Sequence, residues 1–294
     1  MVAVRAIEVR AFGGPEVLEL VETPRPEPGP GEVLVRVRAA GVNPADWKVR
    51  AGIVDRLGPP PLRLGLDLSG EVEGTGEEVY GLWLSKWGAY AEYVAVAREA
   101  LAPKPVNLDH AQAAALPTAV LTAWQALVNV AKVEAGQRVL IHAAAGGVGH
   151  FAVQIAKARG AYVLGTARAE NHEFLRELGA DELIDYTATD FADVVRGVDV
   201  AYDLIGGEYG RRTLATLKPE GVLLDAVGDD AEGDPRHHRF YVSPSGPDLV
   251  SVNELVEAGR LSVHVERTFP LEQAALAHEL SETGRVRGKI VLTP

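Results

Sequence analysis

Alternating apolar and polar residues recur through the first part of the chain, up to about residue 96. Alternation with a period of two is typical of strands that bury one face, and it occurs at 33–39, 70–73 and 90–96. The stretch 24–31 is rich in proline and glycine, which interrupt both regular structures, so we expect a loop there. Together these segments predict a β-rich domain.

The pattern changes from about residue 109, where helical segments at 110–117 and 120–128 come first. Strands and helices then alternate, which predicts a parallel sheet with right-handed crossovers. The predicted strands are 139–143, 162–166, 182–186, 198–204 and 222–227, with helices at 171–178 and 211–217. Beyond residue 247 we expect a helix at 248–258, a strand at 261–266, a helix at 271–282 and a strand at 289–292.

The run 139–149, VLIHAAAGGVG, is the most informative segment. An apolar strand leads into a glycine turn, and a helix over 151–159 follows, which Gly160 can end in a left-handed cap. Glycines let the backbone turn tightly and approach a ligand closely, and free N–H groups at the helix start would face an anion such as a pyrophosphate. The segment therefore predicts a dinucleotide site. Its turn residues are Gly146, Gly147, Val148 and Gly149.

Composition narrows the classes of partner. The chain has 294 residues and a formal net charge of −12, which argues against a nucleic-acid partner, because phosphate binding needs clustered basic residues. The charge also suits a protein that does not rely on anionic membranes. No apolar run reaches the length of about 18 residues that indicates a transmembrane helix. The alternating N-terminal segment lacks a signal-peptide core.

Cysteine is absent, so disulfides, thiolate metal sites and a cysteine nucleophile are impossible. We expect no metal site from the eight histidines, because no His-Glu-x-x-His pair occurs. His237 and His238 lie in a charged stretch that we interpret as a surface loop. With no signal peptide, we expect the protein in a reducing cytoplasm.

The end of the second strand of the alternating part indicates the choice of cofactor. An NAD enzyme usually carries an acidic residue there, about 20 residues after the glycines, to bind the ribose hydroxyls. Here Arg168 stands in that place, where it can pair with a 2′-phosphate, and Thr166 can donate a hydrogen bond to it. Glu170 opposes this interpretation, and a solvated surface arginine is the alternative. We predict NADPH as the cofactor.

Four segments resemble the medium-chain dehydrogenase/reductase superfamily, and most closely its zinc-free quinone oxidoreductase and enone reductase branch. They are AGVNPADWKVRAG at 40–52, AALPTAVLTAWQAL at 114–127, the glycine turn, and VRGKIVL at 286–292. The resemblance covers nearly the whole chain in the family's order. It implies an NADPH-dependent reductase of small quinones or α,β-unsaturated carbonyls.

The resemblance also implies a fold of the α/β class. A Rossmann doubly wound parallel sheet at 118–255 would be inserted in a mainly β, GroES-like substrate domain built from 1–117 with 256–294. It further implies a cleft between the domains with NADPH across it. A homodimer is expected on the same ground.

Catalysis without zinc is implied by one departure from the zinc members, which place a cysteine where this chain has Asn43. That metal would polarise a substrate oxygen, so another group must do so. By resemblance to enone reductases with an Asn-Pro-x-Asp-x-Lys stretch, Lys48 is the candidate electrophile, and a solvated lysine is the alternative. Many quinone oxidoreductases have tyrosine at Lys48 and at Val54, which leaves quinones and enones both open.

Further site residues follow from the resemblance. Asn43 would hydrogen-bond the nicotinamide ribose or the substrate oxygen, although it can also be a turn residue before a proline. Thr122 would lie beside the nicotinamide, or it is a packing residue of its helix. The other implied cofactor contacts are Tyr186 near the adenine-ribose phosphate, Ile205, Val227 and Gly228 at strand ends, and Lys289.

Three other functions are weighed against this one. An NADPH-binding redox sensor or structural protein would keep the glycine turn without needing Lys48 or turnover, and a fold resemblance does not exclude it. A short-chain dehydrogenase is disfavoured, because none of the eight tyrosines has a lysine four residues later. A Rossmann-like methyltransferase would have no use for a β domain built from both ends of the chain.

Overall fold

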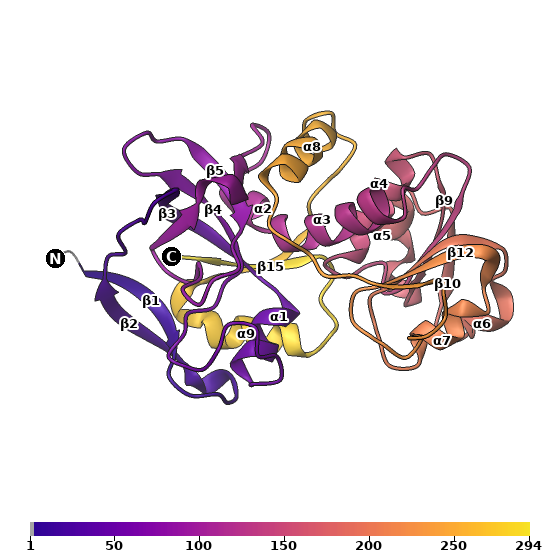
Figure 1. Ribbon diagram of the computed structural model, residues 1–294, viewed down its shortest axis with the longest axis horizontal. Helices are drawn as coiled ribbons and strands as arrows, with labels where there is room; N and C mark the ends of the chain where they lie inside the picture. Colours follow the sequence, from indigo (N-terminus) through magenta and orange to yellow (C-terminus); the bar gives the residue numbers. More distant parts are fainter. Residues whose placement is uncertain (1–2) are drawn as a thin grey trace. The chain divides into compact units, whose positions relative to one another are not determined.

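The computed structural model describes residues 3–294, which form two compact units (Figure 1). The first unit combines the residues up to Leu121 with Ser243–Ala258 and Val263–Pro294. The second combines Thr122–Val242 with Gly259–Ser262. The range expected for the Rossmann domain, 118–255, therefore differs from the second unit at both ends.

The first unit is built on a seven-stranded sheet, whose strands are antiparallel to their neighbours except for one pair, β14 and β15. The order is β14 (Val265–Pro270), β15 (Lys289–Thr293), β3 (Glu32–Val42), β4 (Asp67–Val72), β5 (Glu78–Leu82) and β7 (Leu101–Pro103), with β6 (Tyr93–Ala97) on β3. A separate antiparallel ribbon joins β1 (Ala3–Val9) to β2 (Leu18–Pro24). The β-rich character predicted for this part is confirmed.

Short helices connect and cover these strands. They are α1 (Pro44–Arg50), α2 (His110–Ala114), α3 (Pro117–Trp124), α8 (Gly246–Glu257) and α9 (Ala274–Glu282), with 3₁₀ turns at Pro15–Val17, Arg98–Ala100 and Leu271–Gln273. α3 starts at a proline, a residue that suits the first helical position, and continues as a π-helical turn, Gln125–Val130. α2 ends before that proline, so the predicted helix 110–117 is shorter than expected.

Helix α8 is anchored to the first unit by specific hydrogen bonds. The buried Tyr80 hydroxyl donates to Oδ1 of Asn253 at 2.6 Å, and the Asn253 amide donates to the Pro103 carbonyl at 2.9 Å. Asn107 donates to the Val256 carbonyl at 3.0 Å. These contacts explain why 243–255 pack here and not with the parallel sheet.

The second unit contains a six-stranded sheet in which every pair is parallel, as predicted. The order is β10 (Glu182–Asp185), β9 (Tyr162–Ala167), β8 (Arg138–Ile141), β11 (Val198–Asp203), β12 (Leu217–Asp225) and β13 (His237–Arg239). Its helices are α4 (Gly149–Ala158), α5 (His172–Glu177), α6 (Phe191–Val194) and α7 (Tyr209–Leu214), with a 3₁₀ turn at Ala169–Asn171. The strand order reverses between β8 and β11, which is where such sheets bind ligands at their carboxyl edge.

Two local predictions are wrong. His237 and His238 are not in a surface loop but in the edge strand β13, where Leu223 lies opposite His237 and the His237 side chain is 5% exposed. The strand expected at 261–266 begins only at Val265, because Ser262 donates two hydrogen bonds to Gln154 of α4. These bonds hold Gly259–Ser262 in the second unit.

Each unit has its own apolar core. In the first, Val35 and Val37 of β3 pack with Leu68 of β4 and Leu292 of β15. In the second, the core is centred on Leu140, where residues of β9, β11 and α6 meet. Over residues 3–294, no helix combines the length and apolarity needed to cross a membrane.

Candidate functional site

The glycine turn follows β8 directly and is sterically restricted. Ala143 has a left-handed φ of +48°, which is unusual for a residue with a side chain, and its carbonyl accepts a hydrogen bond from Gly146 at 2.9 Å. A Cβ atom at Gly149 would lie 2.3 Å from that carbonyl oxygen. Only glycine fits where α4 begins, and the N-cap residue of this ten-residue helix, Val148, makes no side-chain hydrogen bond to its first N–H groups. The fit supports the assignment of Gly146, Gly147, Val148 and Gly149 to a dinucleotide site.

Arg168 and Tyr186 meet at the carboxyl ends of β9 and β10. The register pairs Ala167 with Asp185, so the two following residues are neighbours, and Nε of Arg168 donates to the Tyr186 hydroxyl at 3.1 Å. The guanidinium is exposed, and it forms no ion pair with Glu170 in the described chain. That hydrogen bond, with smaller contributions from nearby acids, raises the pKa of Arg168. The pair has the composition of a phosphate-binding clamp.

Thr166 does not belong to this clamp. Its side chain is fully buried, and its hydroxyl lies 3.1 Å from Nδ1 of His142, beneath the turn. The expected hydrogen bond from this hydroxyl to a 2′-phosphate is therefore not available. The cause is that both faces of β9 are covered, since every residue of this strand after Tyr162 is buried.

His142 is a site residue that the sequence reasoning missed. The Thr213 hydroxyl donates to the Tyr209 carbonyl at 2.6 Å, so its oxygen accepts from Nε2 of His142 at 2.9 Å. Nδ1 is then left to accept from the Thr166 hydroxyl, which defines a neutral tautomer. Burial, with the nearby Arg212 charge, lowers the pKa of His142 to about 3. The sequence did contain a signal for this residue, because a histidine in an apolar strand just before the glycines is unusual.

Two acids hold the turns after the next strands. Oδ1 of Asp203 accepts from the backbone N–H groups of Ile205 and Gly206 at 2.8 and 3.1 Å. Oδ1 of Asp225 accepts from those of Val227 and Gly228 at 2.8 and 2.6 Å. Sequence reasoning assigned the turns to the site and missed both acids, although each ends an apolar strand.

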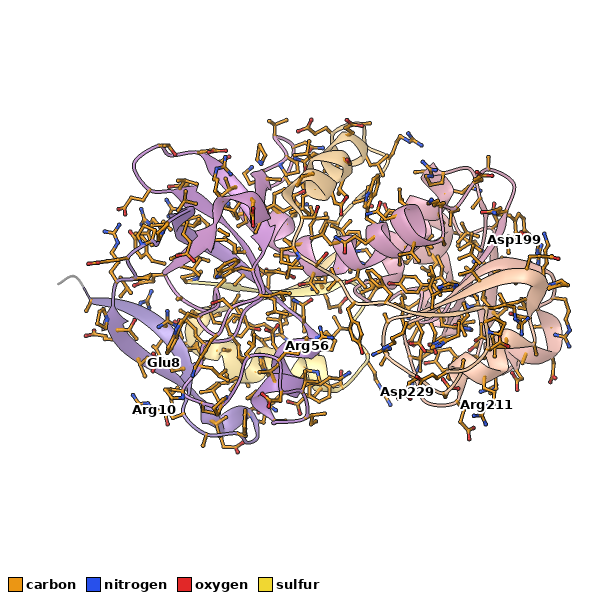
Figure 2. All side chains as sticks on the ribbon, viewed as in Figure 1. Glu8, Arg10, Arg56, Asp199, Arg211 and Asp229 are labelled. Carbon is orange, nitrogen blue, oxygen red and sulfur yellow. The ribbon has the colours of Figure 1, made fainter. Side chains whose placement is uncertain are left out.

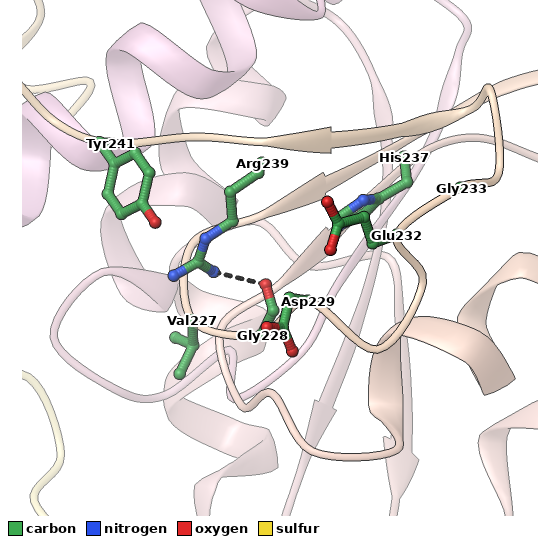
Figure 3. Close-up of a pocket in the computed structure, with 8 residues that line it drawn as sticks. All are labelled: Val227, Gly228, Asp229, Glu232, Gly233, His237, Arg239 and Tyr241. Carbon is green, nitrogen blue, oxygen red and sulfur yellow. Dashed lines mark hydrogen bonds between the residues drawn. The ribbon is translucent and has the colours of Figure 1, made fainter.

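A cavity of about 510 Å³ opens beside the second of these turns (Figure 3). Arg239 donates to the Gly228 carbonyl at 2.7 Å and lies over the ring of Tyr241, 4.9 Å from its centroid. The wall is therefore both cationic and aromatic. Its lining residues are Val227, Gly228, Asp229, Glu232, Gly233, His237, Arg239 and Tyr241.

The first unit contains a buried polar cluster around Asn43, a residue that the sequence assigned to the site. Asn43 begins α1, and its amide donates to Oδ2 of Asp67 at 2.9 Å. Nζ of Lys289, 3% exposed, donates to Oδ1 of Asn43 at 2.5 Å and lies 3.5 Å from Oδ2 of Asp67. The backbone N–H of Thr118 donates to Oδ1 of Asp67 at 2.7 Å. Lys289 thus fixes Asn43 from inside the protein, a role different from the direct cofactor contact that the resemblance implies.

Asp46 completes this cluster. Its carboxylate accepts from the backbone N–H of Asn43 at 2.8 Å and from that of Gly65 at 3.1 Å, and so fixes the start of α1. Burial raises the pKa of Asp46 to about 7, against the opposing effect of these two hydrogen bonds. The sequence analysis did not identify Asp67 as a site residue. Its position as the one acidic residue in a mainly apolar stretch was the signal for it.

Lys48 and Thr122 lie in different units. Lys48 is half-buried on α1, with Nζ 5.6 Å from the centroid of the Trp47 ring, and has no hydrogen-bond or ion-pair partner within residues 3–294. Thr122, on α3, is 8% exposed, and its carbonyl accepts from the Tyr202 hydroxyl at 3.0 Å. The ammonium of Lys48 is therefore available to an external ligand.

Known proteins match this chain along its length. The zinc-binding dehydrogenase family matches residues 178–292, and the alcohol dehydrogenase GroES-like domain matches residues 29–106. The chain is 34% identical to 2-haloacrylate reductase of Burkholderia sp, over 99% of each chain. It is 35% identical to the chloroplastic NADPH-dependent alkenal/one oxidoreductase of Arabidopsis thaliana, over 96% of this chain and 78% of that one.

A solved structure gives the same result. The quinone oxidoreductase from Coxiella burnetii has a TM-score of 0.92 and 37% identity over 100% of both chains. The chain belongs to the medium-chain dehydrogenase/reductase superfamily. Within this superfamily it falls in the zinc-free quinone oxidoreductase branch, as the sequence predicted.

The zinc of other medium-chain dehydrogenases does not fit these residues. The chain has no cysteine, and Asn43 stands where the zinc members have one. Its Oδ1 already accepts from a buried ammonium, that of Lys289, so a second cation there would be repelled. No step of the reaction is therefore derived through zinc.

We predict that Lys289→Met destabilises the protein by about 3–5 kcal/mol, because it leaves the buried Asp67 without its counter-charge. In the double variant Lys289→Met, Asp67→Asn, the loss is smaller than the sum of the two single losses, because no unpaired charge is left. Urea denaturation of the three variants measures this. Additive losses would contradict the charge pairing.

We also predict a pH-dependent cost for His142→Gln. Between pH 6.5, the ordinary pKa of histidine, and the native pKa of about 3, His142 takes up a proton in the unfolded chain but not in the folded protein. The free energy of unfolding therefore decreases by about 1.4 kcal/mol for each unit by which the pH falls. The substitution removes that loss, so it costs about 3 kcal/mol more at pH 7.5 than at pH 4.5. Urea denaturation at both pH values measures the difference. The exposed His238→Gln is the control, and an equal cost of His142→Gln at both pH values refutes the prediction.

Proposed function

We propose that this protein is an NADPH-dependent reductase of quinones or α,β-unsaturated carbonyls, and that it acts without zinc. The observation that carries the cofactor choice is the clamp of Arg168 and Tyr186, at 3.1 Å, on the strands next to the glycine turn. An arginine in place of an acidic residue favours a 2′-phosphate over free ribose hydroxyls.

The substrate class is supported by what three relatives have in common. Their names give a quinone, a 2-haloacrylate and an alkenal or alkenone as substrates. In all of these a carbon–carbon double bond is conjugated to a carbonyl group, and hydride addition moves negative charge onto oxygen. The protein then needs a cation or a donor for that oxygen.

When bound, the cofactor supplies the hydride from nicotinamide C4. We assign to Lys48 the stabilisation of the developing negative charge on the substrate oxygen, because its ammonium has no hydrogen-bond or ion-pair partner among residues 3–294. Oδ1 of Asn43 accepts from Lys289, and one of its amide hydrogens is donated to Asp67. The other amide hydrogen can therefore be donated to the ribose or the substrate. Thr122 is retained as a nicotinamide contact.

The remaining cofactor contacts are divided by function. The glycine turn with the start of α4 would hold the pyrophosphate, and Ile205, Val227 and Gly228 would border the cofactor through turns held by the two capping acids. A homodimer is expected from the resemblance to the family, and a cytoplasmic location is part of the same proposal. Both stay predictions, and sedimentation of the purified protein tests the first.

We predict that Arg168→Ala raises the Kd of NADPH about 10–100-fold and that of NADH less than about threefold, since only NADPH loses a charge-assisted bond. Fluorescence titration of both cofactors measures this. Arg176→Ala, which removes an exposed arginine from α5, is the matched control. Equal losses for both cofactors would overturn the NADPH assignment.

We predict that Lys48→Ala lowers kcat/KM for enones about 10²–10³-fold, with NADPH affinity little changed, because the oxygen loses its electrophile. NADPH oxidation is followed with an enone panel and a quinone panel. Lys86→Ala is the matched control, since that lysine also lies near a tryptophan ring, 5.8 Å from the Trp87 centroid.

The outcomes of this assay separate the alternatives. Quinone turnover that is insensitive to Lys48→Ala would remove the lysine from the mechanism. Tight NADPH binding without turnover of either panel would replace the reductase by a redox sensor.

A further inference from the structure

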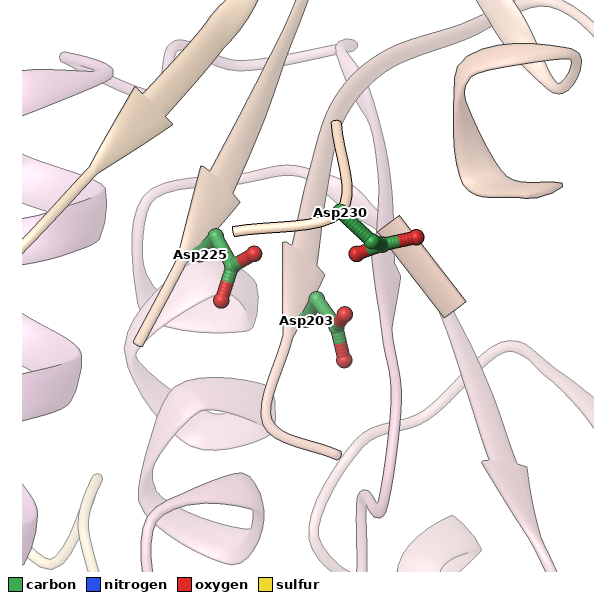
Figure 4. Close-up of side chains that lie close together, drawn as sticks. All are labelled: Asp203, Asp225 and Asp230. Carbon is green, nitrogen blue, oxygen red and sulfur yellow. The ribbon is translucent and has the colours of Figure 1, made fainter. Parts of the chain in front are cut away.

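Three carboxylates gather at the carboxyl ends of β11 and β12 in the second unit: Asp203, Asp225 and Asp230 (Figure 4). Each contributes one oxygen to a group whose members all lie within 4.8 Å of one another. Asp203 and Asp225 are fully buried, and Asp230 is partly buried. Carboxylates this close need counter-charges or protons.

The charge of Asp225 is balanced within the protein. Nη1 of Arg239 donates to its Oδ1 at 3.1 Å, and Nε2 of His237 lies 3.3 Å from its Oδ2. Together with the two backbone N–H groups of the following turn, these donors satisfy both oxygens. The carboxylates of Asp203 and Asp230 therefore carry the excess charge.

Asp203 and Asp230 each have a buried oxygen without a hydrogen-bond partner in residues 3–294: Oδ2 of Asp203 and Oδ1 of Asp230. The other oxygen of Asp203 holds the turn at Ile205, and that of Asp230 accepts from the backbone N–H of Arg211 at 2.8 Å. Neither carboxylate forms an ion pair in that part of the chain. A buried carboxylate oxygen without a donor is costly, so a positive ligand is favoured there.

Glycine backbone borders these oxygens. A Cβ atom at Gly228 would lie 3.1 Å from Oδ2 of Asp225 and 3.4 Å from Oδ1 of Asp230. A Cβ atom at Gly210 would lie 2.4 Å from the same oxygen of Asp230. A side chain at Gly210 would crowd the oxygen of Asp230 that lacks a partner, so the cluster keeps room at this oxygen.

We propose that Asp203, Asp225 and Asp230 bind a hard divalent cation of the size of Ca²⁺. Two oxygens on one cation are at most twice the metal–oxygen distance apart, which is about 4.2 Å for Mg²⁺ and about 5 Å for Ca²⁺. The 4.8 Å limit on the separations in the cluster is therefore compatible with Ca²⁺, with water completing the coordination. His237 and Arg239 also line the cavity of Figure 3, which offers a route from solvent.

This cation site does not rest on the proposed function. Its effect would be structural: the cation neutralises carboxylates that hold the turns at Ile205 and, through Asp225, at Val227. The competing occupant is a proton shared by Asp203 and Asp230. It would satisfy the same two oxygens but leave no response to added metal.

The test uses the purified full chain after treatment with a chelator, titrated with CaCl₂ or MgCl₂ alone by isothermal calorimetry and thermal unfolding. We expect one Ca²⁺ per chain and an increase in Tm. Asp230→Asn weakens Ca²⁺ binding by at least about tenfold, because a carboxylate ligand is lost. The same variant without metal has a higher Tm than the metal-free wild type, because its amide can donate to the free oxygen of Asp203.

Asp229→Asn is the matched control. It removes the same charge from the adjacent, exposed residue, which lies with Arg211 at one end of the second unit (Figure 2), and it leaves the affinity within about twofold. Asp203→Asn is the second test variant and also loses the Tm response to Ca²⁺. A wild type with neither binding heat nor a Tm change at millimolar Ca²⁺, or an equal loss in Asp229→Asn, overturns the cation site. A stability that depends on pH and not on Ca²⁺ overturns it in favour of the shared proton.

Discussion

Every parallel strand leaves backbone N–H groups without a ladder partner where it enters a turn, and the second unit depends on how these groups are satisfied. Asp203 and Asp225 each accept from two successive N–H groups after their strands. After β8 the chain uses tight backbone bonds and glycine, while His142 secures the turn from below. The edge that faces a ligand is thus rigid before any ligand arrives, and a preorganised edge avoids ordering costs on binding.

In the first unit, the main constraint is that charged groups are buried inside a β-rich core. The ammonium of Lys289 lies between the amide of Asn43 and the carboxylate of Asp67, and the same carboxylate accepts from the first backbone N–H of α3, that of Thr118. The cluster connects β15, α1, β4 and α3, so one set of polar contacts fixes the start of both helices. An apolar core would not specify these orientations as sharply, because apolar packing lacks direction.

Much of this was accessible from the sequence. Five of the six strands of the parallel sheet and the glycine turn follow from periodicity, and so do the positions of Arg168 and Tyr186 at strand ends. The direction of a side chain within a strand was harder to predict. Thr166 and Arg168 are two residues apart, yet Thr166 points into the interior and Arg168 lies beyond the strand end. The partners of buried charges were also missed, since Asp67 and Lys289 are more than two hundred residues apart.

The pairing of β15 with β3 also sets the order in which the chain can fold. Nζ of Lys289 binds the carbonyl of Val42 across a separation of 247 residues, and Ile290 lies opposite Val42 in the sheet. During synthesis, the sheet that contains β3 stays incomplete until β15 has been made. All strands of the second unit have been synthesised before that point. Closing so long a loop is entropically costly and slow. The part made first is therefore completed last, and during that interval its unpaired strand edges need protection from other chains.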